Sequence, residues 1–114
     1  MIDLPNIPYG STDEKLIVGR LVETLLAAGF TLSVHDDCEG RGETVLKQST
    51  DKAAIFAALA STDGDILYVH KPDGKKSFVT LIWGNGTDII SDYGMSLDDI
   101  ITPVNFYADE LAGV

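Results

Sequence analysis

The sequence holds little that would support a disulfide-linked, secreted or membrane-spanning protein. Its one cysteine, Cys38, cannot form a disulfide within the chain, and a single thiol fits a reducing compartment. No apolar run approaches the roughly 20 residues that a membrane helix needs. The first 15 residues contain neither a basic segment nor an apolar stretch, so we expect no secretory signal. These absences predict a cytoplasmic protein that does not enter a membrane.

Positive charge is missing from the C-terminal third. Residues 77–114 carry six carboxylates and no Lys or Arg, so they supply −6 of the net charge of −10. A region of one sign repels nucleic-acid backbones and anionic membranes, and it attracts cationic surfaces. We therefore expect a basic protein surface as partner, with no direct nucleic-acid binding and no membrane binding. The charge pattern does not define an oligomeric state.

The length and composition fit one domain over residues 1–114. A chain of this length buries enough surface to fold without disulfides, and its 45% apolar content supports a hydrophobic core. Pro5, Pro8 and Gly10 predict an irregular lead-in over residues 1–10.

Two helices are expected in the first half of the chain. Ser11 and Glu14 have the spacing of a capping box, and apolar residues then recur every three or four positions. This pattern predicts a helix over residues 12–28. Residues 49–51 open a second, alanine-rich helix, which the turn at residues 62–64 ends.

Five strands are expected from apolar alternation and from the turns between them: residues 30–35, 43–48, 66–70, 78–83 and 87–92. Asn85-Gly86 is the preferred dipeptide for a two-residue type I′ hairpin between the last two strands. The register of that hairpin has three sensible facing pairs: Phe78 with Tyr93, Ile82 with Ile89 and Leu81 with Ile90.

The C-terminal segment predicts one or two short helices. Ser96 is expected to cap a helical turn over residues 97–101, and Thr102-Pro103 to start the chain on a final helix. The element order is then α-β-β-α-β-β-β-α. Since every link between neighbouring strands is short, we expect an α+β fold with an antiparallel sheet of about five strands and helices mainly on one face.

Two groups of residues suggest metal or acid–base chemistry. The segment from His35 to Glu39 holds an imidazole, a thiol and carboxylates, but zinc sites draw a second pair of ligands from elsewhere. We interpret it as a polar loop and predict no metal and no cofactor. His35 and His70 both fall on expected strands, yet no serine, cysteine or carboxylate pair can be placed beside them from the sequence. An enzyme that uses these histidines is therefore the less favoured alternative.

The candidate interaction surface combines the C-terminal acids with two amphipathic aromatic residues. An alternative is a solvated face that promotes solubility, because acids at a helix start are favoured by the helix dipole in any case. Trp83 fits either the core or an interface anchor. The residues of the expected surface are Asp88, Asp92, Asp98, Asp99, Asp109, Glu110, Tyr93 and Tyr107.

Three segments carry a resemblance to small proteins encoded in bacterial genomes and phages: Asp65-Ile-Leu-Tyr-Val, Phe78-Val-Thr-Leu-Ile-Trp-Gly-Asn-Gly and Asp88-Ile-Ile-Ser-Asp-Tyr93. Those proteins share a YGN-type turn followed by a D-[VI]-I-x-D-Y segment. The similarity covers the central and C-terminal two-thirds of the chain. It implies an accessory protein of a mobile element, and it transfers no catalytic residue.

Taken together, these patterns predict a non-enzymatic, acidic protein-binding or regulatory module. An alternative that uses the same negatively charged surface is an inhibitor that mimics nucleic acid and blocks a host DNA-handling or defence enzyme.

Overall fold

The computed structural model describes residues 5–36, 44–60 and 63–113. Residues 5–10 form neither helix nor strand, as predicted, although Ile7 is buried in the core. The elements that follow are α1 (Thr12–Ala27), β1 (Thr31–Asp36), β2 (Thr44–Ser49), α2 (Lys52–Ala58), β3 (Gly64–His70), β4 (Lys76–Ile82), the 3₁₀ turn η2 (Gly86–Asp88), β5 (Ile90–Tyr93), the 3₁₀ turn η3 (Met95–Leu97) and α3 (Asp98–Leu111).

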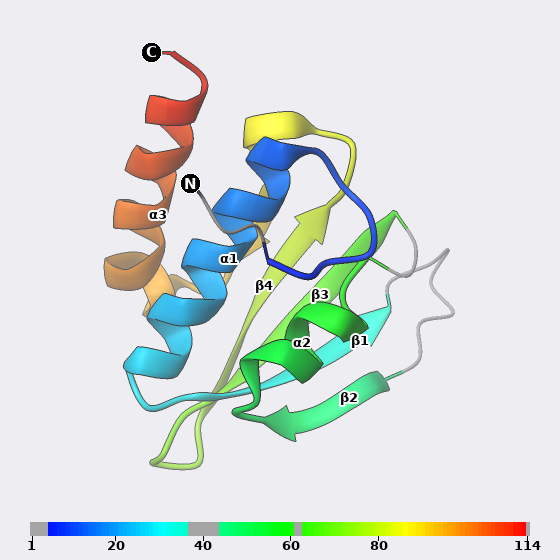
Figure 1. The fold of residues 1–114 in the computed structure, drawn as a ribbon. Helices are drawn as coiled ribbons and strands as arrows, with labels where there is room; N and C mark the ends of the chain where they lie inside the picture. The colour runs from blue at the N-terminus through cyan, green and yellow to red at the C-terminus, as the bar shows by residue number, and fades with distance from the viewer. Residues whose placement is uncertain (1–4, 37–43, 61–62, 114) are drawn as a thin grey trace.

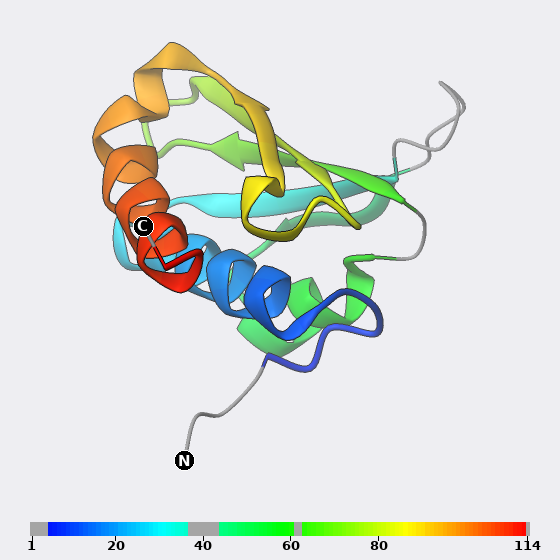
Figure 2. The same cartoon turned by 90° about the horizontal axis from the view of Figure 1, so that it is seen from above.

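The strands form one antiparallel sheet in the order β2-β1-β3-β4-β5. All three helices lie on the same face of this sheet, with α3 beside α1 (Figures 1 and 2). The predicted fold class is confirmed. No helix in the described ranges is long and apolar enough to cross a membrane.

Helix α1 begins where the sequence predicts. The Ser11 hydroxyl accepts from the Glu14 amide at 3.2 Å, and the Glu14 carboxylate accepts from the Ser11 amide at 2.8 Å, which completes the capping box. The apolar stripe then packs on the sheet, and each fully buried aliphatic side chain contributes about 1.5–3 kcal/mol. Its fully buried members are Ile17, Val18, Leu21, Val22 and Leu25.

The two faces of the sheet differ because side chains alternate along each strand. Leu67 and Val69 of β3 are fully buried under the helices. Ile66, Tyr68 and His70 alternate with them and are half-buried, so they point to the face opposite the helices. Among the described residues, no helix or strand covers that second face, which we call the open face.

The β4–β5 connection differs from the predicted two-residue hairpin. Gly84 and Gly86 have positive φ values of 97° and 61°, whereas Asn85 has φ −94°, which excludes a type I′ turn on Asn85-Gly86. The cause lies in α1: the Glu14 carboxylate accepts from the amides of Gly84 at 2.7 Å and Gly86 at 3.1 Å. The loop therefore wraps around the start of α1, and β5 begins only at Ile90.

The predicted register is correct next to the loop and wrong further along the strands. The Ile82 amide donates to the Ile89 carbonyl at 2.9 Å, as the predicted pairing of these two residues requires. Leu81 faces Ile90 as expected, but an irregularity between Thr80 and Leu81 shifts the rest of the ladder by one position. Tyr93 therefore faces Val79 instead of Phe78, and it lies on the helix side of the sheet.

Helix α3 is continuous, in contrast to the predicted short pieces. It runs through Pro103, and Ser96 makes no capping hydrogen bond to it. The helix persists because Ile101, Val104 and Ala108 share one side and bury it in the core. Since these contacts lie on both sides of Pro103, ending the helix there would expose them.

Trp83 belongs to the core, with 5% of its surface exposed. Its indole nitrogen donates to the buried Asp65 carboxylate at 2.7 Å, and the same oxygen accepts from the Ala60 amide at 2.7 Å. The interface alternative for Trp83 is thereby excluded. Asp65 joins the end of β4 to the segment after α2.

Candidate functional site

Four of the six predicted carboxylates lie on the outward side of α3. Asp98 and Asp109 are eleven positions apart, as are Asp99 and Glu110, and this spacing is about three helical turns. All four side chains are exposed, whereas the core-facing side of α3 carries apolar residues. The two pairs therefore stand one above the other along the helix.

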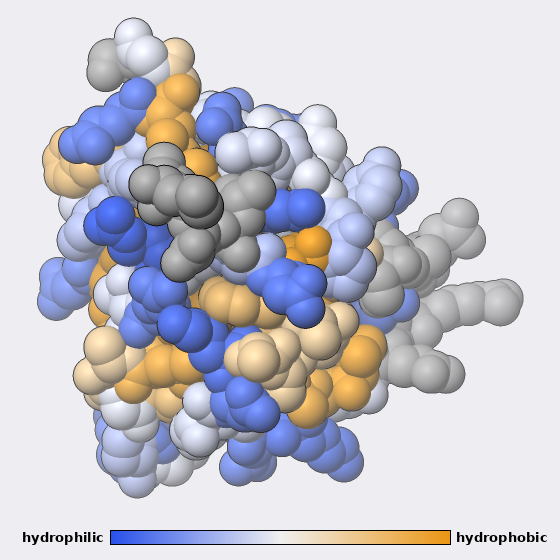
Figure 3. Space-filling model, in the orientation of Figure 1, coloured by the Kyte–Doolittle hydropathy of each residue, from blue (hydrophilic) through white to orange (hydrophobic). Residues whose placement is uncertain are grey.

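An exposed aromatic residue lies between the two pairs. Phe106 is 65% exposed, seven positions after Asp99 and four before Glu110, so it shares their side of α3. Sequence reasoning did not single out Phe106. Its signal was available, because it falls outside the apolar stripe that Val104 and Ala108 form. Figure 3 shows hydrophilic and hydrophobic residues intermixed along α3.

The junction between β5 and α3 extends this surface. Asp92, Tyr93, Met95 and Asp98 line a pocket of about 390 Å³, and Met95 is 91% exposed. The Tyr93 hydroxyl donates to Asp98 at 2.9 Å. That hydrogen bond, helped by burial and by the charges of Asp98 and Asp92, raises the pKa of Tyr93 above its ordinary value of 10.0. We call the surface formed by Asp92, Met95, Asp98, Asp99, Phe106, Asp109 and Glu110 the acidic edge.

The other two predicted residues lie beside this surface. Asp88 is exposed in η2, which contacts both α1 and α3. Tyr107 is half-buried and stacks under Arg20 of α1, whose guanidinium carbon is 4.3 Å from the ring centroid. This cation–π contact ties Tyr107 to the α1–α3 interface, so its ring does not share the outward side of Phe106.

The described lysines and arginines do not neutralise the acidic edge. Within residues 5–36, 44–60 and 63–113, the ion pair is Lys52 with Glu23, at 3.4 Å between α2 and α1. None of the six predicted carboxylates forms an ion pair with a base in these ranges. The negative charge is therefore available to a partner.

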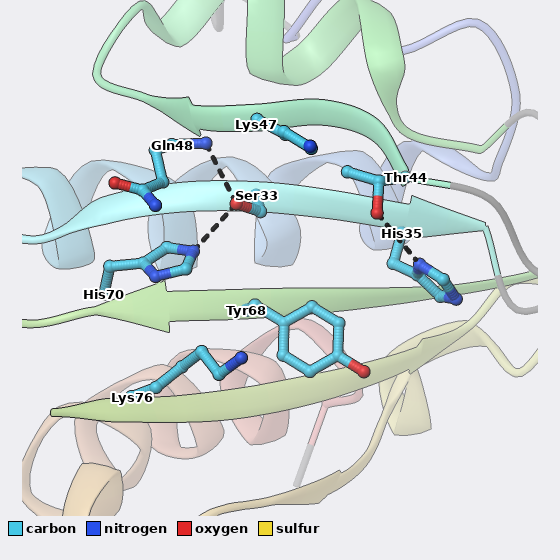
Figure 4. A pocket seen from close by; sticks show the side chains of 8 residues that line it. All are labelled: Ser33, His35, Thr44, Lys47, Gln48, Tyr68, His70 and Lys76. Carbon is cyan, nitrogen blue, oxygen red and sulfur yellow. Dashed lines mark hydrogen bonds between the residues drawn. The ribbon is translucent and has the colours of Figure 1, made fainter.

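A second site lies on the open face, where Figure 4 shows it with the helices behind the sheet. Strands β1, β2, β3 and β4 each contribute to an open pocket of about 450 Å³. Its lining residues are Ser33, His35, Thr44, Lys47, Gln48, Tyr68, His70 and Lys76.

Ser33 and His70 form the closest polar pair in this pocket. Ser33 is 6% exposed, and its hydroxyl oxygen accepts from the Gln48 amide at 2.9 Å. Its proton is then available to the His70 Nε2, 2.8 Å away. Burial, together with the charge of Lys76, lowers the pKa of His70 below its ordinary value of 6.5, which favours the neutral, accepting imidazole.

The two histidines lie at opposite ends of the pocket. His35 faces Ile66 in the β1–β3 ladder and His70 faces Thr31, so they are four positions apart along the strands, or about 13 Å. The His35 Nδ1 contacts the Thr44 hydroxyl at 3.4 Å instead. The strands thus place both histidines on one face, but they do not form an acid–base pair. Sequence reasoning missed Ser33, which pairs with a residue 37 positions away.

In the described part of the chain, no group of three or more His, Cys, Asp or Glu side chains could hold a metal ion. Of the predicted polar loop, Asp37, Cys38 and Glu39 lie outside the described residues.

Comparison with known proteins assigns neither site. No protein-family model matches the chain, and no curated protein and no solved structure shows significant similarity to it.

Proposed function

We propose that this protein is a non-enzymatic binding module that uses its acidic edge to hold a basic surface of another protein. The single observation that carries the proposal is the outward side of α3, where the exposed ring of Phe106 lies between two pairs of carboxylates that form no ion pair with a described base. Its role as an accessory protein of a mobile element is supported by the sequence resemblance alone.

Binding would proceed in two physical stages. The carboxylates attract a cationic surface over a distance of about 10 Å at 0.1 M salt and orient it during the encounter. Phe106 and Met95 then lose their exposed surface to the partner, and aromatic residues at the centre of an interface often dominate its binding energy. The acids would form the rim, and the ring would act as the anchor.

A role in solubility alone explains this surface less well. Charged groups keep a protein soluble, but a ring that is 65% exposed acts against solubility. A mimic of duplex DNA is also less well supported. The α3 carboxylates stand as two pairs about 16 Å apart, whereas duplex DNA carries one charge per roughly 1.7 Å.

The test is a charge reversal at the acidic edge. The variant Asp99→Lys/Glu110→Lys should weaken binding to a captured basic partner at least about tenfold at low salt, and the wild-type affinity should fall steeply as salt rises. Asp63→Lys/Asp73→Lys changes the net charge equally at exposed positions outside the edge and leaves the ion pair of Glu23 with Lys52 in place, so it serves as the control.

Phe106→Ala separates the anchor from the charges. It should weaken binding without changing the salt dependence. Equal binding by the charge-reversed and control variants would refute the proposal. A partner that is displaced by duplex DNA would instead indicate the mimic.

A further inference from the structure

The open-face pocket concentrates positive charge in a strongly acidic protein. The chain has eighteen acids against eight Lys and Arg residues. Even so, Lys47 and Lys76 line the pocket together with both histidines of the chain, and no described Asp or Glu does. A chance surface of this protein would be acidic, so the pocket is matched in charge to an anion.

The floor of the pocket presents an aromatic ring. Tyr68 lies on β3 near the middle of the sheet, and Figure 4 shows its ring turned flat toward the viewer. His35 meets this ring edge to face at a centroid distance of 5.9 Å, and the Lys76 ammonium lies 5.2 Å from its centroid. The ammonium lies over the ring in a cation–π contact. A planar ligand group would therefore stack on the ring as the flexible Lys76 side chain turns from the ring toward an anionic group of the same ligand.

The backbone at the rim of the pocket is held in an uncommon conformation. Gln48 is not a glycine, yet it has φ 39°, in the left-handed region. Its amide is thereby directed at the Ser33 hydroxyl, which in turn contacts His70. Strain of this kind persists where the surroundings fix it and is concentrated at ligand sites. Here the Gln48 backbone holds the Ser33 hydroxyl against the His70 imidazole, at the end of the pocket near Lys76.

We propose that the open-face pocket binds a small ligand that joins a planar ring to a phosphate group, as a nucleoside monophosphate does. The ring would stack on Tyr68, and Lys76 would contact the phosphate. Lys47 lies on β2, which β1 and β3 separate from β4, so it adds to the positive field of the pocket without contacting the same phosphate. The Ser33–His70 pair supplies polar contacts for the part of the ligand that joins the ring to the phosphate. The pocket volume of about 450 Å³ is in the range of small-molecule sites.

A nucleic-acid strand fits this surface less well than a single nucleotide. Beyond β4, the open face continues to β5, where Asp92 is paired with Thr80 and exposed. A polyanion that crossed the sheet would meet this carboxylate, and the net charge of −10 would repel its remaining phosphates.

The experiment is an NMR titration of the ¹⁵N-labelled protein with AMP, adenosine and inorganic phosphate as probes. We expect AMP to shift the amide signals of Ser33, Gln48, Tyr68 and His70. Adenosine and phosphate should each bind about tenfold more weakly, because each lacks one half of the recognised chemistry.

Two adjacent lysines provide a matched pair of variants. Lys76→Ala should weaken AMP binding about tenfold, since it removes a charged contact to the phosphate. Lys75→Ala makes the same change of charge one position away in the same hairpin, outside the pocket lining, and should leave the affinity within about twofold. Tyr68→Leu should weaken AMP binding about tenfold with little effect on phosphate.

Three results would overturn the inference. One is the absence of shifts in the pocket at about 10 mM AMP, a concentration that would reveal even weak binding. Another is an affinity for phosphate equal to that for AMP, which would remove the ring from the recognition. The third is an equal loss in Lys75→Ala and Lys76→Ala, which would reduce the effect to overall charge.

Discussion

Two buried carboxyl groups form hydrogen bonds that connect distant segments of the chain. Glu14 is 2% exposed and joins the start of α1 to the loop after β4. Asp65 is fully buried and joins the Trp83 indole to the Ala60 amide. Together with the bond from the Ser11 amide to Glu14, these hydrogen bonds pair four backbone amides and the Trp83 indole with the two carboxyl groups.

Replacing Glu14 by Gln should destabilise the fold by about 1–3 kcal/mol at neutral pH. Both carboxylate oxygens of Glu14 accept from backbone amides, whereas glutamine offers one accepting oxygen and turns an NH₂ group toward a donor. Urea denaturation measures the change. Glu23→Gln, which alters an exposed ion pair, should cost less than about 1 kcal/mol and is the control.

The same carboxylate links stability to pH. Burial raises the pKa of Glu14, but hydrogen bonds from Ser11, Gly84 and Gly86 outweigh that effect and lower it below its ordinary value of 4.5. The stabilisation is thus fully present above pH 4.5 and is lost as the pH falls through the folded-state pKa. The difference between wild type and Glu14→Gln should therefore shrink on acidification. A difference that stays constant down to acidic pH would contradict this role.

At the scale of single elements, α3 contains a substitution site that should stabilise the protein. Pro103 lies inside the helix and is exposed, and it lacks the amide that would bond to the Asp99 carbonyl. Pro103→Ala should raise the free energy of unfolding by about 1–2 kcal/mol, since the restored hydrogen bond and better helix propensity outweigh the extra freedom of the unfolded chain. Thr102→Ala in the same turn restores no backbone hydrogen bond, so it is the control and should stabilise the protein less. An unchanged or lowered midpoint in urea for Pro103→Ala would show that the proline is needed for packing.

Elements defined by local patterns were predictable from the sequence, and those defined by distant contacts were not. The capping box at Ser11 and the alternation around Tyr68 specify α1 and β3 within a few residues. The loop after β4 depends on Glu14, which lies 70 positions before Gly84. No dipeptide rule for Asn85-Gly86 contains that contact, so the hairpin was predicted wrongly.

The candidate sites follow the same division. The acids of the acidic edge were predicted from the sequence, but their common side was not. Helical spacing places Asp99 and Glu110 on one side only because α3 continues through Pro103, where a break was predicted. The open-face pocket required knowledge of which strands are neighbours. Ser33 meets His70 only because β1 pairs with β3, although β2 and α2 separate them in the sequence.

On the scale of the whole molecule, charge of each sign is gathered in a different place. The acidic edge lies along β5 and α3, at one end of the strand order. The open-face pocket draws its two lysines from β2, at the opposite end, and from the start of β4. The net charge is −10, and the six acids of residues 77–113 form no ion pair with a described base, so we expect electrostatic self-repulsion at this end of the fold that salt should relieve.

Glu110→Lys tests this repulsion, and its stability shows whether a loss of binding could be due to unfolding. The change lowers the net charge from −10 to about −8 and places a cation in the last turn of α3, where the helix dipole favours it. We expect a gain of about 0.5 kcal/mol at low salt that fades toward 1 M salt, measured by thermal unfolding at both salt concentrations. Asp99→Lys should gain less stability, because it removes an acid from the first turn, where the dipole favours negative charge.

The Glu110→Lys variant also separates a loss of binding from a loss of folding. If it is at least as stable as wild type yet binds the partner more weakly, the loss of binding belongs to the acidic edge. A variant that unfolds at low salt would instead show that Glu110 stabilises the helix, and that charge repulsion is not the dominant force at this end of α3.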